Sequence, residues 1–188
     1  MANRGLSYIR YAKCANEDAT LYEEVKSLRG AKTSQFKPNT VEGKDFADNE
    51  TWIEDNFVID GTLTLGLADE DLQTEAELLG YGYEEGELQV KADAEAPFFG
   101  IGQIVETKTK GGKVRYKVEF IRKIKFKPFE SNSETRKDSI SYSGPTLEGT
   151  VYIPTDGIYQ KKKEFDTLEA AKTALNAYFP QTDDGGMK

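Results

Sequence analysis

The residues with the clearest chemical character are the cations of the stretch KVRYKVEFIRKIKFKPF, which starts at Lys113. Its first fifteen residues, 113–127, carry seven cations and one acid, in a chain whose formal net charge is -8. The stretch therefore contributes +6, and the rest of the chain sums to -14 (-8 minus 6). Cations at this density can bind phosphates, an acidic protein surface, or only water.

The spacing of these cations favours a solvated strand edge or a protein interface over nucleic acid. Cations and apolar residues alternate, with Lys113, Arg115, Lys117, Lys123, Lys125 and Lys127 at odd positions and Val114, Tyr116, Val118, Phe120, Ile124 and Phe126 at even ones. Period two predicts a strand with the cations on one face and the rings on the other. The rings then cannot interleave with the cations as stacking platforms for bases. Arg122 interrupts the apolar face, where we expect a bulge or a strand end.

Other reactive groups are scarce. The chain has no histidine, and its one cysteine, Cys14, permits no internal disulfide. This composition excludes Ser/His/Asp and Cys/His catalysis and the usual zinc sites. The acids near Asp69 suit a helix start, and DNETWIEDN does not match a calcium loop. Hydrolysis by paired carboxylates stays open, without a spacing that supports it. We therefore predict no catalytic residue, metal or cofactor.

Length and hydropathy bound the organisation of the chain. At 188 residues with 11% aromatics, we predict a single domain over residues 1–180 and a flexible C-terminal tail over 181–188. No apolar run approaches the roughly 20 residues of a membrane span, and MANRGLSYIRYAK lacks the apolar core of a signal peptide. We expect a protein without a membrane anchor that is made and folded in a cytoplasm.

The basic strand belongs to a predicted hairpin. The stretch FFGIGQIVETKTK (98–110) also alternates, and Gly111 and Gly112 suit a tight turn, so residues 99–127 should form one long antiparallel hairpin. A further strand, FVIDGTLTLGL, should place Phe57, Ile59, Leu63, Leu65 and Leu67 on one face and Asp60, Thr62 and Thr64 on the other. Strand patterns also occur within DSISYSGPTLEGTVYIP (138–154), on both sides of a Gly-Pro break, and weaker ones occur at 8–12 and before Pro38.

Two short amphipathic helices complete the prediction. One follows Asp69, its expected N-cap, and ends at Gly80; the other begins at Asp166 or Thr167 and ends before Pro180. The fold class is therefore α+β, mainly β, with a short acidic helix and a flanking C-terminal helix. Between the strands lies a polar acidic segment, TVEGKDFADNETWIEDN (40–56). It is long for a connection, and its aromatic residues suggest packing on its own domain or contact with a neighbour.

The order of these features resembles a known family. The quoted runs are GLSYIRYAK, TLTLGLADEDLQTEAELLGY, DAEAPFFGIGQIVETKTKGGKVRYKVEFIRKIKF, GPTLEGTVY and KEFDTLEAAKTAL. In this order they resemble the major tail proteins of long-tailed, non-contractile bacteriophages of Gram-positive hosts. The resemblance covers nearly the whole chain, and it lies in the succession of the motifs, since no single motif is specific.

The resemblance implies a structural protein of the virion tail. Its fold would be a tail-tube-type β-barrel or sandwich, whose subunits close into six-fold rings that stack into a tube for the genome. The implied partners are other copies of the chain and the tail tip or initiator, tape measure and tail terminator proteins. DNA would pass through without specific binding, and a long loop would reach a neighbouring subunit.

Site residues follow as hypotheses. A tube wall that bound phosphates would hold the DNA, so we expect a neutral or acidic lining, for which the face of Asp60, Thr62 and Thr64 is the candidate. We expect the basic face, with Lys117, Lys123 and Lys125, to point away from the lumen, toward a neighbouring subunit or the tube exterior. The candidate inter-subunit loop is 45–56, with Asp45, Phe46, Trp52 and Ile53 as interface residues.

Two other functions stay open. A tail terminator or a related secretion-tube subunit would share the fold, and would differ in whether stacking stops at one ring. A small-molecule-binding β-barrel or acidic β-barrel enzyme would need a concave pocket with convergent polar groups, and the sequence offers no constellation for one.

Overall fold

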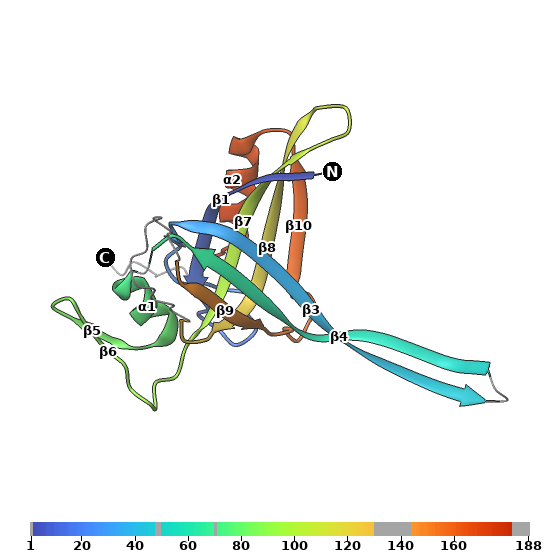
Figure 1. Ribbon diagram of the computed structural model, residues 1–188, viewed down its shortest axis with the longest axis horizontal. Coiled ribbons are helices and arrows are strands. Elements are labelled where there is room, and N and C mark those ends of the chain that lie inside the picture. Colours follow the sequence, from blue (N-terminus) through green and yellow to red (C-terminus); the bar gives the residue numbers. More distant parts are fainter. Residues whose placement is uncertain (1, 48–49, 70, 130–143, 182–188) are drawn as a thin grey trace, which may run out of the picture.

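A computed structural model describes residues 2–47, 50–69, 71–129 and 144–181 (Figure 1). The chain is mainly β, and the α+β, mainly β class predicted from the sequence is confirmed. The strands are β1 (Ala2–Lys13), β2 (Lys26–Ser27), β3 (Ala31–Ala47), β4 (Glu50–Leu67), β5 (Gly82–Glu84), β6 (Glu87–Gln89), β7 (Phe98–Lys108), β8 (Val114–Phe126), β9 (Thr146–Val151) and β10 (Gln160–Phe165). The helices are α1 (Leu72–Leu79) and α2 (Leu168–Ala177). Neither is long and apolar enough to cross a membrane, as far as the described chain goes.

One antiparallel sheet forms the body of the protein. Its order is β2-β1-β7-β8-β9-β4-β3, with β10 also pairing with β8, and β5 and β6 form a separate small hairpin. The strands at the two ends of this order do not pair with each other, so the described chain does not close the barrel that the family resemblance allowed. Figure 1 shows α2 lying along β7 and β8, and α1 beside the β5–β6 hairpin.

The predicted long hairpin is confirmed as β7 and β8, joined through Gly111 and Gly112. Gly112 has φ +82°, a conformation that side chains rarely adopt. β8 is not a sheet edge, however. It pairs with β7 along one side, and with β10 and then β9 along the other. The solvated-edge interpretation of the basic strand is therefore wrong.

A bulge interrupts β8 where Arg122 breaks its pattern, as the sequence indicated. Phe99 pairs with Ile124 and Ile101 with Ile121, so β8 has one extra residue between these two pairs. Because one extra residue reverses the alternation of side chains, the even positions of β8 do not share one face. Phe120 packs under α2, whereas Ile124 packs against the opposite face of the sheet.

The core accordingly has two parts. The larger lies where the curved sheet folds over itself, between β1, β7 and β8 on one side and β4 and β9 on the other, with α1 at its end. The smaller lies between α2 and the other face of β7 and β8. Its buried members are Ala12, Ala19, Tyr22, Ile104, Val118, Phe120, Ala171, Leu175 and Phe179.

Both helices have capped ends. Thr167 is the N-cap of α2, as predicted, and its hydroxyl accepts from the amide of Ala170. For α1 the predicted N-cap was wrong, because Asp71 rather than Asp69 accepts from the amide of Thr74 (3.2 Å). Gly80 ends α1 at φ +70°, as expected of a C-terminal glycine.

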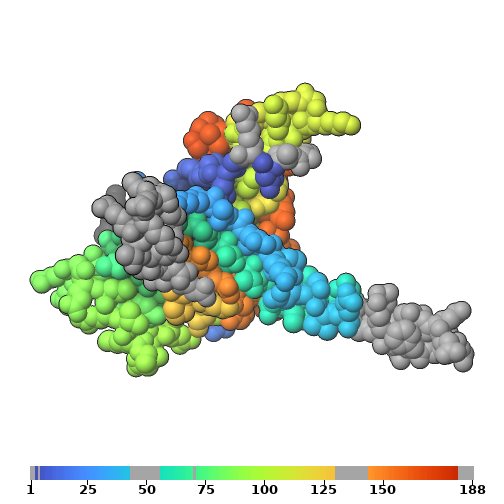
Figure 2. All heavy atoms as spheres, viewed as in Figure 1, coloured from blue at the N-terminus to red at the C-terminus, as the bar shows by residue number. Residues whose placement is uncertain are grey.

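The largest departure from the sequence prediction is the acidic segment 40–56. It is not a loop: β3 continues through it to Ala47 and pairs with β4 as far as Glu50. β4 pairs with β9 only over Gly61–Gly66. Beyond that point no other described strand pairs with β3 or β4, and we call this two-stranded part, residues 39–47 and 50–60, the arm. It projects from the body in Figure 1, and Figure 2 shows the part of the arm nearest the body leaving it.

Two sequence predictions fall on residues outside the described chain. These are the strand at Ile140 and Tyr142 and the flexible tail, apart from Gln181.

Candidate interaction surfaces

The cations of the basic strand all have polar partners within the chain. Six of them form ion pairs: Lys113 with Asp166 (2.9 Å), Arg115 with Glu164 (3.4 Å), Lys117 with Glu119 (2.8 Å), Lys125 with Glu95 (3.3 Å), Arg122 with Asp156, and Lys127 with Glu148. The seventh, Lys123, donates to the carbonyl of Glu17 (2.6 Å). Phosphates would have to displace these partners, so the strand is a poor nucleic-acid site.

The predicted interface lysines do not share a face. Lys117 lies on the face of Glu119 and Ile121, toward β4. Lys123 and Lys125 lie beyond the bulge and flank the ring of Phe98, with Nζ 4.4 and 5.5 Å from its centroid. The bulge is the physical reason, since it reverses which face the odd positions occupy.

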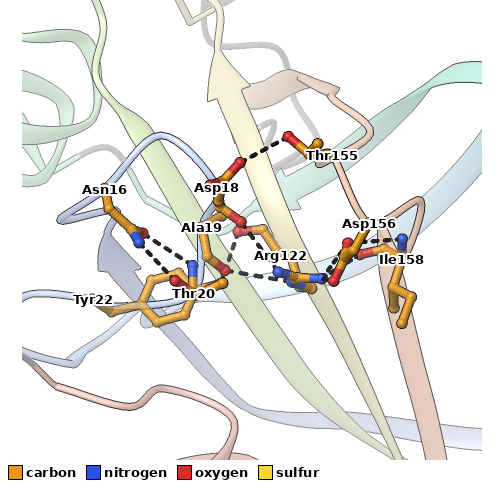
Figure 3. Close-up of polar contacts among 9 residues, drawn as sticks. All are labelled: Asn16, Asp18, Ala19, Thr20, Tyr22, Arg122, Thr155, Asp156 and Ile158. Carbon is orange, nitrogen blue, oxygen red and sulfur yellow. Dashed lines mark hydrogen bonds and ion pairs between the residues drawn. The ribbon is translucent and has the colours of Figure 1, made fainter.

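Arg122 is the buried centre of a polar network (Figure 3). Its side chain is 6% exposed, and Nη1 donates to both carboxylate oxygens of Asp156 (2.7 and 2.5 Å). The guanidinium also donates to three carbonyls, those of Asp18 (3.1 Å), Ala19 (3.4 Å) and Ile158 (3.1 Å). Arg122 thereby joins the β8 bulge to the 14–22 loop and to the turn before β10.

The ionisable groups around Arg122 suit a structural role and not catalysis. Hydrogen bonds from Arg122 and from the amide of Ile158 hold the pKa of Asp156 below its usual range. The hydroxyl of Tyr22 lies 2.8 Å from the carbonyl of Ala19, and burial raises its pKa well above the usual value. The carboxylate is committed to the guanidinium and the phenol stays protonated, so neither is poised as a general base.

Cys14 is an inert thiol. Burial raises its pKa to about 12, which the nearby cations of Lys123 and Arg122 only partly offset. Its Sγ lies 3.8 Å from the carbonyl of Arg122. A thiol that stays protonated near neutral pH is a poor nucleophile, so the structure supports a bystander role.

The described residues form hollows of very different sizes. One of about 470 Å³, lined among others by Leu28, Asp71 and Thr74, has room for a small molecule. A cavity of about 20 Å³, lined among others by Phe36, Gln103 and Glu119, is large enough for about one water molecule. Burial raises the pKa of Glu119, but hydrogen bonds from Lys117 and Gln103 outweigh it and leave the pKa below its usual range. The described residues also contain no group of three side chains suited to hold a metal.

The candidate lining residues Asp60, Thr62 and Thr64 are half-buried on β4, on the face away from the core. Asp60 accepts a hydrogen bond from the side-chain amide Nδ2 of Asn39 (2.6 Å). Across the sheet Thr62 is opposite Lys37, and Thr64 is opposite Glu148. The structure thus brings the three residues onto one face, and the face is of mixed charge rather than acidic.

The arm exposes apolar side chains. Val41, Phe57 and Ile59 are 41%, 57% and 48% exposed. Val41 and Phe57 are directly opposite in the ladder, and Ile59 is the extra residue of a bulge in β4. The alternation in FVIDGTLTLGL predicted that Phe57 shares the core face with Leu63. This prediction is wrong, because the bulge at Ile59 reverses the alternation between the two residues. The sequence did not identify Val41 as an exposed strand residue, because the acidic segment around it has no clear strand pattern.

The other predicted interface residues also belong to the arm. Asp45 and Phe46 are in β3, Trp52 and Ile53 are in β4, and Asp45 pairs with Ile53. The structure describes these four residues by their backbone only. It places them in the ladder that carries Val41 and Phe57, farther from the body.

A second charged surface lies on β10, which sequence reasoning did not single out. Lys161, Lys162 and Lys163 are all exposed, and none has a carboxylate within 4 Å among the residues described. Lys161 and Lys163 lie over the rings of Tyr178 and Phe165, at 5.5 and 5.3 Å from the centroids. The signal in the sequence was the run QKKKEF at 160–165.

In comparisons with known proteins, no family model matches this chain and no curated protein matches its sequence.

Proposed function

We propose that this protein is the structural subunit of a homo-oligomeric tube, the major tail tube protein of a long-tailed bacteriophage, as the order of its motifs implies. The observation that carries the proposal is the arm, a two-stranded ribbon that leaves the body with Val41, Phe57 and Ile59 exposed. In the virion tail, this subunit would form six-fold rings that stack into the conduit for the genome.

The arm should be unstable as an isolated ribbon. A two-stranded ribbon is at best marginally stable in water, because it has no third strand and no packed face. Among the described residues, no strand pairs with either outer edge of the arm, and its apolar side chains stay exposed. Docking on another subunit would bury those side chains and stabilise the ribbon, which is a reason for a monomer to associate.

The charges suit a conduit for DNA. The rest of the chain outside 113–127 is strongly acidic, and the cations of the basic strand already have partners within the chain. Under this proposal the face of Asp60, Thr62 and Thr64 lines the channel, and Lys117, Lys123 and Lys125 face away from it. DNA then passes without phosphate contacts that would hold it.

The experiment that tests the proposal is negative-stain electron microscopy of the purified protein at low and high concentration, paired with sedimentation velocity. We expect hollow tubes or stacked rings of uniform diameter, either spontaneously or after addition of pre-formed tail tips. A chain that stays monomeric in both conditions would contradict the proposal. Rings that never stack would instead favour the tail terminator.

A further inference from the structure

The exposed cations of β10 differ from those of the basic strand beside it. All seven cations of the stretch 113–127 have a partner within the chain, whereas Lys161, Lys162 and Lys163 form no ion pair with any described residue. The fourth charged residue of β10, Glu164, pairs with Arg115 of β8. Of the ten cations in 113–127 and β10, the four without a described carboxylate within 4 Å are therefore Lys123 and the three lysines of β10. The charges of Lys161 and Lys162 also help to lower the pKa of Asp156 and of Glu119, respectively.

β10 is also an edge strand. It pairs with β8 through Gln160–Phe165, and no described strand pairs with its other side. Lysines on an edge strand hinder indiscriminate pairing, because a docking strand must accommodate their charge. An acidic strand is the exception, since its carboxylates would neutralise the lysines while its backbone completes the ladder.

The arm supplies an acidic strand. Its described stretches, 39–47 and 50–60, contain six acids and one lysine, a net charge of -5. Both outer edges of the arm are free of strand partners among the described residues. The arm is therefore complementary to β10 in two ways: its charge is opposite, and its free edge can pair with the free edge of β10.

The arm cannot reach β10 of its own chain. β3 and β4 are paired continuously from the body outward, and Figure 1 shows the arm ending far from β10. Bending back would break that ladder. A contact between arm and β10 must therefore join two copies, and because the two surfaces differ, it is a head-to-tail contact that produces rings or filaments.

We propose that the edge of β10, with Lys161, Lys162 and Lys163, is the docking site for the acidic arm of a second copy of this chain. This assignment rests on the proposed function, in which the arm joins subunits, and it names the surface that receives the arm. Ile158 lies just before β10 and is 47% exposed. It provides an apolar contact for the exposed side chains at the base of the arriving arm.

Charge reversal on each surface tests the pairing. The edge-reversed variant is Lys161→Glu/Lys162→Glu/Lys163→Glu, and the arm-reversed variant is Glu42→Lys/Glu54→Lys/Asp55→Lys. By sedimentation velocity at about 50 mM salt, we expect each variant alone to need at least about tenfold more protein than wild type to associate, because like charges then face each other. Far-UV circular dichroism checks that each variant is folded.

The decisive step is to mix the two variants in equal amounts. In an alternating assembly the acidic arm of one variant meets the lysines of the other, and the basic arm meets the glutamates, so every contact is matched. We expect the mixture to associate at close to the wild-type concentration. Restored association also excludes misfolding as the cause of the loss.

A matched control separates a specific contact from net charge. Lys91→Glu/Lys108→Glu/Lys110→Glu makes the same change in charge at exposed lysines outside β10, and we expect it to associate like wild type. If wild type associates and the edge-reversed variant associates equally well, or the mixture is not restored, the docking site is wrong while the proposed function stands. If wild type associates under no condition, both fail.

Discussion

Arg122 shows how one residue sets the local architecture. A charged side chain in the apolar pattern of a strand needs partners once it is buried, and here three carbonyls and Asp156 provide them. Since those partners belong to the 14–22 loop and to the 154–158 turn, Arg122 holds both segments against β8. A methionine of similar length would leave these carbonyls without a donor.

We predict that Arg122→Met lowers the free energy of unfolding by about 2–4 kcal/mol. Urea denaturation followed by circular dichroism measures the change. The control is Lys125→Met on the same strand, whose partner Glu95 is 87% exposed, so that loss of the pair should cost less than about 1 kcal/mol. Equal effects for the two variants would show that the Arg122 network does not anchor the loops.

Cys14 gives a prediction about reactivity. With the pKa raised to about 12, about one thiol in 10⁴ is ionised at pH 8 in the folded protein. We expect a disulfide reagent such as DTNB to label the native protein about a thousandfold more slowly than the protein unfolded in urea. Comparable rates in the two states would mean that the thiol is not buried as described.

For single residues, the sequence showed which side chains break the strand pattern, but not which residues they contact. The break in the apolar alternation at Arg122 is visible in the sequence, and it predicted a bulge or a strand end there. The partners of Arg122 are not visible, because Asp18 is 104 residues away and Asp156 is 34 residues away. The same holds for the ion pairs of the basic strand, which come from carboxylates on four different parts of the chain.

Among the elements, the hairpin of β7 and β8 was predictable and the arm was not. Clear alternation on both sides of Gly111 and Gly112 identifies two strands and a turn. In the segment 40–56, glycine, asparagine and many acids are poor strand formers, so local preference indicated a loop. Pairing of β3 with β4 over the whole length overrides that preference, and only tertiary structure shows it.

The contact between α2 and the sheet depends on the absence of a side chain at Gly102. A Cβ there would lie 2.3 Å from Cδ1 of Leu175 and 3.1 Å from Cδ2 of Phe120. We predict that Gly102→Ala destabilises the protein by about 1–3 kcal/mol, because α2 must shift away from β7. Thermal or urea unfolding measures this change.

Gly111 in the same hairpin is the matched control. An added Cβ at Gly111 meets nothing within 4 Å, and its φ is not positive. Gly111→Ala should therefore change the free energy of unfolding by less than about 0.5 kcal/mol. A Gly102→Ala protein as stable as the Gly111→Ala protein would contradict the close packing of α2 on β7.

At the scale of the whole molecule, the mainly β class and the flanking helix followed from the sequence, but the strand order did not. Alternation fixes which residues can share a face within one strand, and it carries no information on which distant strand lies alongside. The splitting of β8 between β10 and β9 is such a case. It places Lys161, Lys162 and Lys163 on an edge, where the sequence had drawn attention to β8 instead.

Under the proposed function, the arm joins copies of this chain. Its removal is the most direct test, and the register shows where to cut: Val41 and Phe57 are directly opposite, so residues 42–56 can be replaced by Asn-Gly to close a two-residue turn. The buried residues of both core clusters lie outside this deletion. The body should therefore keep the tyrosine part of its near-UV circular dichroism, while the contribution of Trp52, the only tryptophan, is lost with the arm.

The measurement is sedimentation velocity of the armless and full-length chains over the same concentrations, with pre-formed tail tips added to both. We expect that the full-length chain forms rings or tubes, while the armless chain stays a folded monomer. Assembly of the armless chain at the same concentration as the full-length chain would contradict it.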